Sequence, residues 1–131
     1  MRGFAPRSNA ASCSVAGTGT QGASGDRGPA TSADLDGPLG VVADGAGNLL
    51  IADAGNNRIQ VVAGKTGTFY GVPMTGGDIY TIAGGQAAGF TGDGGLAVSA
   101  KLNDPTGVAL TAAGDLLIAD SGNGRIRLVT G

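Results

Sequence analysis

The chain has 131 residues, and 41% of them are hydrophobic, which is enough to bury one core. Its formal charge of −2 creates no basic surface that would attract phosphate backbones, so we expect no nucleic-acid partner. Only 4% of the residues are aromatic and tryptophan is absent, so small aliphatic side chains must fill the core. The 27 glycines, about three times the usual share, and ten acidic residues that are all aspartate predict many turns and an all-β fold.

The first segment, residues 1–12, has no hydrophobic periodicity and is predicted to be a loose N-terminal tail. Cys13 is the only cysteine and the chain has no histidine, which excludes an intrachain disulfide and a thiolate metal site. No stretch of 18 apolar residues occurs, and the first residues lack the apolar region of a secretory signal. We therefore expect no membrane partner, and these features leave the compartment unknown.

Two long segments of the chain repeat each other. Residues 14–64 align without a gap with residues 81–131, so that Thr81 falls on Ser14 and Asp93 on Asp26, and about half of the paired positions are identical. Repetition at a fixed spacing is typical of architectures in which each unit buries its apolar face against a neighbour. The region 13–131 is therefore predicted to consist of two stacked units.

Each unit is predicted to form four short strands. The pattern is one strand, a long glycine-rich connection, and then three strands joined by tight turns; these strands are 14–16, 40–43, 48–52 and 58–62 in the first copy, and 81–83, 107–110, 115–119 and 125–129 in the second. Residues 65–80 separate the copies and are predicted to form an extended hairpin arm, with a return strand over 78–83. The units therefore read as antiparallel four-stranded meanders, the form of a β-propeller blade.

Several motifs closely resemble the NHL repeat. They are Gly25-Asp-Arg-Gly-Pro-Ala-Thr-Ser-Ala-Asp-Leu, Pro38-Leu-Gly-Val, Gly47-Asn-Leu-Leu-Ile-Ala-Asp and Asn56-Asn-Arg-Ile, together with their counterparts between Gly92 and Ile126. The resemblance implies a β-propeller, usually six-bladed, of which this chain supplies about two blades. Such propellers occur in large bacterial repeat proteins, in receptor and kinase sensor domains, and in some enzymes. The resemblance also implies an extracellular or cell-surface location.

The polar residues that recur in both copies are interpreted as turn residues. Asp53 and Asp120 each stand in an Asp-x-x-Asn-x-Arg-Ile turn, where the carboxylate caps the turn and faces an arginine. Active sites are seldom duplicated identically, so a structural role is favoured. The set assigned to turns comprises Asp26, Asp93, Asp53, Asp120, Asn56, Asn123, Arg58 and Arg125.

No catalytic, cofactor-binding or metal-binding residue is predicted. Asp34 and Asp36 with Gly37 could suggest calcium, but the second copy has Lys101 in place of Asp34. Residues 17–22 match the Gly-x-Gly-x-x-Gly dinucleotide fingerprint, yet the glycines and proline that follow prevent the helix that this motif needs. Serine and threonine nucleophiles lack a histidine base, and Cys13 lacks a partner.

The predicted arm carries the one feature that is not duplicated. Phe69, Tyr70 and Tyr80 are three of the five aromatic residues of the chain. Two interpretations are open: the rings pack against the side of a neighbouring blade, or they form an exposed contact for a partner.

Two hypotheses about function follow. The first is a non-catalytic binding or scaffold module whose contacts come from loops at one propeller face and from the arm. The alternative is a piece of a propeller enzyme, of the lyase or lactonase type, whose catalytic residues lie in other blades. Assembly is a separate question, since two repeats seldom form a stable stack alone. Three copies could close a six-bladed ring, with residues 14–16 of one copy beside 125–129 of the next, or flanking blades could be missing.

Overall fold

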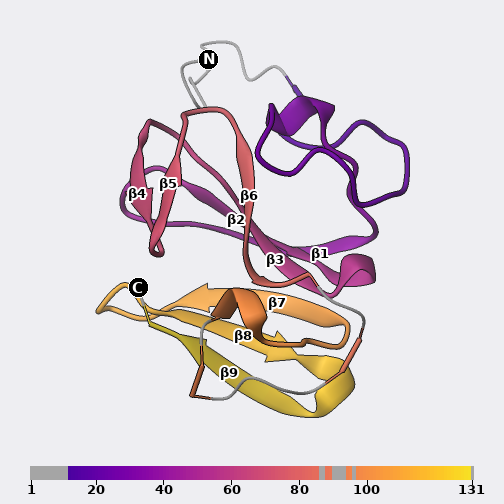
Figure 1. Ribbon diagram of the computed structural model, residues 1–131, viewed down its shortest axis with the longest axis vertical. Helices are drawn as coiled ribbons and strands as arrows, with labels where there is room; N and C mark the ends of the chain where they lie inside the picture. The colour runs from indigo at the N-terminus through magenta and orange to yellow at the C-terminus, as the bar shows by residue number, and fades with distance from the viewer. Residues whose placement is uncertain (1–11, 86–87, 90–93, 96, 131) are drawn as a thin grey trace.

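The computed structural model describes residues 12–85, 88–89, 94–95 and 97–130. These residues form antiparallel β-sheets and four short 3-10 turns, which confirms the all-β fold class. The first blade is a four-stranded sheet in the order β1-β2-β3-β6, in which β1, β2 and β3 come from the first repeat (Figure 1). Its strands are β1 (Pro38–Ala43), β2 (Leu49–Asp53), β3 (Arg58–Val62) and β6 (Ile79–Gly84).

A two-stranded hairpin is inserted between β3 and β6. It consists of β4 (Gly67–Phe69) and β5 (Val72–Met74), so it occupies the segment predicted as an arm, and β6 is the return strand. Tyr70 and Gly71 form its turn with φ angles of 54° and 76°. Two successive residues with positive φ are typical of the type I′ turn, whose twist matches that of the flanking strands.

The second repeat forms a three-stranded sheet of β7 (Pro105–Leu110), β8 (Leu116–Asp120) and β9 (Arg125–Val129). Its register repeats that of the first sheet: Val41 pairs with Ile51 between β1 and β2, and Val108 pairs with Ile118 between β7 and β8. Both blades also have a 3-10 turn before their third strand and another in the connection that precedes the first; the four turns are Ala30–Ser32, Ala54–Asn56, Ala97–Ser99 and Ser121–Asn123.

The strand predicted at residues 14–16 is not present. These residues form no strand in the structure, whereas their counterparts 81–83 lie within β6 and pair with β3. A short segment becomes a strand only beside an edge that can accept its hydrogen bonds. No sheet edge of the described chain pairs with residues 14–16, so the local sequence alone does not make them a strand.

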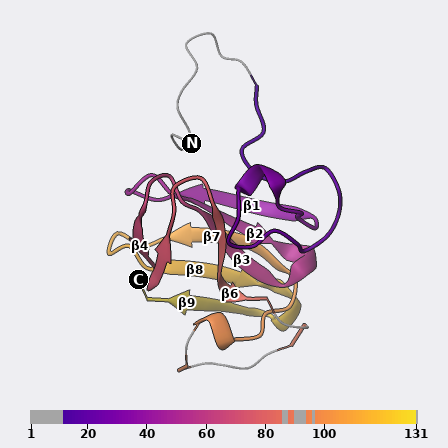
Figure 2. The same cartoon turned by 45° about the horizontal axis from the view of Figure 1, so that its top comes forward.

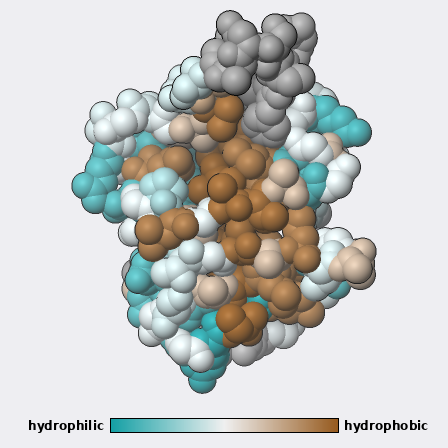
Figure 3. Space-filling model, turned by 180° about the vertical axis from the view of Figure 1, so that it is seen from behind, coloured by the Kyte–Doolittle hydropathy of each residue, from teal (hydrophilic) through white to brown (hydrophobic). Residues whose placement is uncertain are grey.

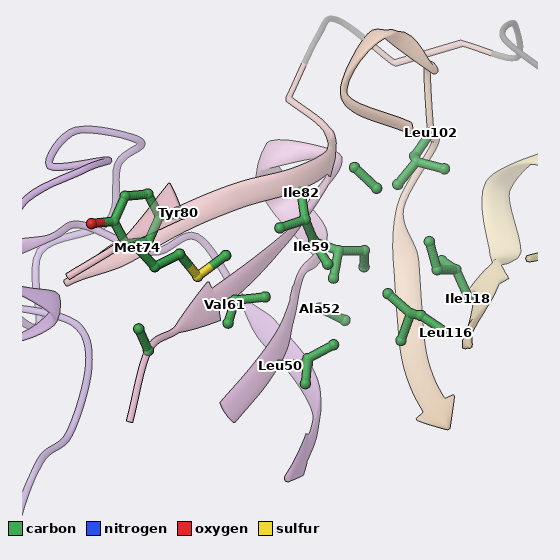
Figure 4. Close-up of a cluster of buried hydrophobic side chains, with 12 residues drawn as sticks. Leu50, Ala52, Ile59, Val61, Met74, Tyr80, Ile82, Leu102, Leu116 and Ile118 are labelled. Carbon is green, nitrogen blue, oxygen red and sulfur yellow. The ribbon is translucent and has the colours of Figure 1, made fainter. Parts of the chain in front are cut away.

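The two sheets stack face to face, and the main core lies between them (Figures 1 and 2). Leu50, Ile59 and Val61 project from the first sheet and are fully buried against Leu116 and Ile118 of the second (Figure 4). The alternation follows from the two-residue period of a strand, which sends every second side chain to the same face. The core is built from aliphatic side chains, with Tyr80 as the one aromatic residue among its fully or nearly buried members.

The first strands of the two blades approach each other closely. A Cβ atom on Gly40 would lie 3.0 Å from the Cα atom of Gly107 and 3.1 Å from the carbonyl oxygen of Thr106. Glycine at position 40 therefore lets β1 and β7 pack backbone against backbone. Within the described ranges, no helix is long and apolar enough to cross a membrane.

Candidate functional site

The first set of predicted site residues forms a buried polar cluster in blade one. Asp53 is fully buried, and its carboxylate accepts hydrogen bonds from Asp36 N at 2.7 Å, Asn56 Nδ2 at 2.8 Å and Arg58 Nε at 3.0 Å. Asn56 also donates to the carbonyl oxygen of Gly22 at 2.7 Å. The cluster therefore ties the glycine-rich connection to the turn between β2 and β3, and every carboxylate contact serves the fold.

The matching cluster in blade two also includes Arg127. Asp120 accepts hydrogen bonds from Asn103 N and Asn123 Nδ2, both at 2.8 Å, as its counterpart does. Arg127 also lies close to this carboxylate, with 3.4 Å between Nη1 and Oδ2. The predicted pairing of Asp120 with Arg125 stays a prediction. Arg125 is exposed and donates to the carbonyl oxygen of Asn123 at 3.0 Å. Two residues along a strand return to the same face, so either arginine could meet the carboxylate.

Asp26 connects three segments of the first blade. Its carboxylate accepts hydrogen bonds from Gln60 Nε2 at 3.1 Å and from the backbone nitrogen and hydroxyl of Thr81 at 3.3 and 3.2 Å. The side chain thus links the connection before β1 to β3 and β6, and these contacts give it a structural role. Its predicted counterpart Asp93 lies outside the described residues.

The carboxylates that suggested calcium are engaged in loop hydrogen bonds. Asp34 accepts from the hydroxyls of Thr18 and Ser24, and these bonds, with the Thr18 bond the larger cause, lower its pKa. Asp36 accepts from Gln21 Nε2. In the part of the chain that the structure describes, no three acidic or cysteine side chains lie close enough to hold a metal ion.

The three aromatic residues of the arm have different surroundings. Tyr80 is 6% exposed and packs in the core, where its hydroxyl accepts a hydrogen bond from Thr75 N at 2.7 Å. Its ring is therefore no part of the arm's outer surface. Phe69 and Tyr70 are half-buried at the hairpin tip and pack partly against the core. A partner contact at these two residues stays a prediction.

The tip of the arm forms one wall of an open groove. The groove has a volume of about 600 Å³ and runs between the arm, the β1–β2 turn and the β7–β8 turn. Phe69 and Leu110 supply apolar surface, while residues 44–46 and 111–114 supply turn backbone. The groove therefore brings both repeats together with the one segment that is not repeated.

A hydrogen-bonded pair holds the arm against this groove. The Tyr70 hydroxyl donates to Asp44 Oδ2 at 2.8 Å, and Asp44 also accepts from Asn48 N at 2.8 Å and Ala46 N at 2.9 Å. Burial by itself disfavours the Asp44 carboxylate, but the hydrogen bonds from Asn48, Tyr70 and Ala46 outweigh it and lower the pKa. Burial first, and then the hydrogen bond and negative charge of Asp44, raise the pKa of Tyr70. The pair is therefore fixed as carboxylate and neutral phenol.

Sequence reasoning missed Asp44 as a partner of the arm. One signal was available: the second copy has Thr111 at this position, where the hydroxyl accepts a hydrogen bond from Asp115 N at 3.1 Å. A carboxylate in one copy, where the other copy has a hydroxyl, indicates a contact that only one of the two blades makes. The long separation between Asp44 and Tyr70 concealed which residue it serves.

Comparison with known proteins identifies the repeats. Residues 35–62 and 102–127 match the family model for the NHL repeat. The chain carries two NHL repeats, folded as blades of a β-propeller, which confirms the assignment made from the sequence.

Relatives with curated descriptions are far longer than this chain. Human teneurin-1 is 33% identical over 95 residues, which cover 65% of this chain and 3% of teneurin-1. Protein SUPPRESSOR OF QUENCHING 1, chloroplastic, from Arabidopsis thaliana is also 33% identical over 95 residues, covering 72% of this chain and 8% of that protein. The chain thus spans less than a tenth of either relative.

A solved structure shares the fold. The crystal structure of an auxiliary nutrient binding protein from Bacteroides thetaiotaomicron matches with a TM-score of 0.56 at 20% identity. The match covers 87% of this chain and 27% of that chain. At this identity the likeness concerns the arrangement of the strands.

Proposed function

We propose that this chain is a non-catalytic recognition module, and that the groove beside the arm is where it holds a protein partner. The single observation that carries the proposal is the composition of that groove, which joins turns from both blades to the tip of the unduplicated arm. Features that recur in both repeats are accounted for by the fold. The arm lies outside both repeats and Asp44 occurs in one of them only, so a role in forming a repeated blade does not account for these residues.

The form of the groove favours an extended peptide over a small molecule. Small-molecule sites are concave and cover most of their ligand, whereas this groove is open along its length. Phe69 and Leu110 offer a surface for one apolar side chain, and aromatic residues in such positions often dominate binding energy. The turn residues 44–46 and 111–114 line the two sides of the groove along which such a peptide would lie. A cell-surface location for this partner stays a prediction from the family resemblance.

The proposal is tested with a displayed library of random peptides selected on the wild-type protein. Enriched peptides are then measured against Phe69→Ala and against Val72→Ala. Val72 pairs with Phe69 across the hairpin and is also half-buried, but it does not line the groove, so it is the matched control.

We expect Phe69→Ala to weaken binding tenfold or more, on the order of 1.4 kcal/mol, and Val72→Ala to leave it unchanged. Circular dichroism establishes that both variants keep their β-structure. Failure to enrich any peptide, or equal binding by wild type and Phe69→Ala, would contradict the proposal.

A further inference from the structure

The outer face of blade two is apolar and exposed. Ile126 and Leu128 are 69% and 55% exposed, values that are unusual for large aliphatic side chains on one strand. They pair with Ala119 and Leu117 of β8, so they lie on the face opposite the one that packs on blade one. A further blade, stacked on blade two as blade two is stacked on blade one, would cover this face.

The same positions in blade one are completely buried. Ile126 and Leu128 align with Ile59 and Val61, which are 0% exposed and pack against the second sheet in the core. Blade two therefore exposes the surface that blade one uses to bind its neighbour. The contact between the two blades within one chain therefore shows what kind of surface would fit here, namely the face of a second sheet of the same type.

Blade one exposes the complementary surface. Leu39 and Val41 are each 61% exposed, and they line a shallow apolar groove of about 350 Å³ with Val15 and Leu35. Val41 aligns with Val108, which packs against the core between the blades. On the side turned away in Figure 1, hydrophobic residues form a band that crosses both halves of the molecule (Figure 3). The exposed face of blade two therefore corresponds to the face with which blade one contacts blade two. The exposed face of blade one corresponds to the face with which blade two makes that contact.

The edge of the second sheet is also matched by a segment of this chain. In blade one, β3 pairs with β6 in a register that places Val61 opposite Tyr80 and Ile59 opposite Ala83. In the described part of the chain, no strand pairs with the corresponding edge of β9. Residues 12–16 align with residues 79–83 of β6, and they form no strand where they lie.

We propose that a second copy of this chain docks head to tail on blade two. Its residues 12–16 add to β9 as a fourth, antiparallel strand, and its first blade covers Ile126 and Leu128 with Val41 and Leu39. Transfer of the β3–β6 register sets Leu128 of one copy opposite Cys13 of the next. Such an interface uses different surfaces on the two partners, so it closes into a ring or continues as a filament.

The register is tested by disulfide trapping. Directly opposite residues of an antiparallel pair come close enough for a disulfide to form. In Leu128→Cys, mild oxidation of the exposed natural Cys13 should therefore link successive copies, giving multimers in a non-reducing gel. Val129→Cys is the matched control, because its side chain lies on the other face of the strand.

We expect multimers from Leu128→Cys, none above dimer from Val129→Cys, and none above dimer from Leu128→Cys combined with Cys13→Ser. Equal linking by the two cysteine variants would overturn the proposed register. An absence of multimers from Leu128→Cys, in protein that keeps the circular dichroism of a β-sheet, would overturn docking by a second copy and favour a further repeat of a longer chain as the occupant.

A second variant tests docking without any cross-link. A Cβ atom on Gly107 would meet only the Cβ of Ala119, at 3.9 Å, so Gly107→Ala fits within one chain. Gly107 aligns with Gly40, whose Cβ position is blocked by the neighbouring blade, so the same methyl group would collide with Gly40 of a docked copy. Gly45→Ala, in an exposed turn with open space around it, is the control.

Light scattering gives the outcome. We expect wild type and Gly45→Ala to show a multiple of the 12.5 kDa chain mass, and Gly107→Ala to shift at least tenfold in concentration toward the monomer. A wild-type protein that is a folded monomer at every concentration overturns the proposal, as does assembly that Gly107→Ala leaves unchanged.

Discussion

The buried ion pair of blade one yields a quantitative prediction about stability. In Asp53→Asn the side chain keeps its size, but Arg58, which is 6% exposed, loses the opposite charge at 3.0 Å. Its other acceptors are the carbonyl oxygens of Ala23 and Asp34, at 3.3 and 3.5 Å. Removing one partner of a buried pair costs roughly 3–5 kcal/mol. We expect about 3 kcal/mol, the lower end, because these carbonyl groups still partly solvate the guanidinium.

Urea unfolding followed by circular dichroism measures this loss. All variants are compared at one protein concentration, since assembly would make apparent stability depend on it. The double variant Asp53→Asn with Arg58→Met removes both charges, so its loss should fall at least about 2 kcal/mol short of the sum of the two single losses.

The equivalent change in blade two is the internal comparison. Asp120→Asn should cost less, because Arg127 lies 3.4 Å from the carboxylate and also donates to the carbonyl oxygen of Lys101 at 2.6 Å. Additive losses for the Asp53 and Arg58 variants, or a larger loss from Asp120→Asn than from Asp53→Asn, would refute the reasoning that the buried charge pair dominates.

Three further predictions concern the arm, the blade contact and the core. Tyr70→Phe should cost about 1 kcal/mol at neutral pH, since it removes a hydrogen bond to a part-exposed carboxylate. Because Asp44 has a lowered folded pKa, its contribution is present above roughly pH 4 and is lost below it; urea unfolding at several pH values should show the two proteins converging in acid. Gly40→Ala should destabilise by about 1–3 kcal/mol through backbone overlap with Gly107, whereas an unchanged melting temperature would argue against that contact. Leu50→Ala should cost about 2–5 kcal/mol, measured by the same unfolding experiment, because the side chain is fully buried.

The parts of the fold that could be predicted are those determined by short stretches of neighbouring residues. The strands expected at 48–52 and 58–62 differ from β2 and β3 by at most one residue at each end. Alternating aliphatic residues and glycine-rich turns define such strands without reference to the rest of the chain. Two strands, β1 and β7, begin two residues earlier than expected, at Pro38 and Pro105, where the register shifts before Gly40 and Gly107.

The parts that could not be predicted depend on contacts between distant segments. Residues 14–16 have the composition of a strand, but composition does not supply the edge that a strand needs. The contact between Asp120 and Arg127 could not be predicted, because Arg125 and Arg127 project to the same face of β9 and the strand period does not say which of them approaches the carboxylate. The Tyr70 contact with Asp44 spans two turns that no local pattern relates.

One asparagine in each blade forms a long-range hydrogen bond that constrains the order in which the parts of the blade can fold. Asn56 holds the carbonyl of Gly22, and Asn123 holds that of Gly89, each across a separation of 34 residues. The connection is synthesised first, yet the amide that fixes it is placed only when the β2–β3 or β8–β9 hairpin has formed. During translation each glycine-rich connection therefore leaves the ribosome before the asparagine that fixes it. Contacts between residues so far apart in the sequence slow the folding of a domain.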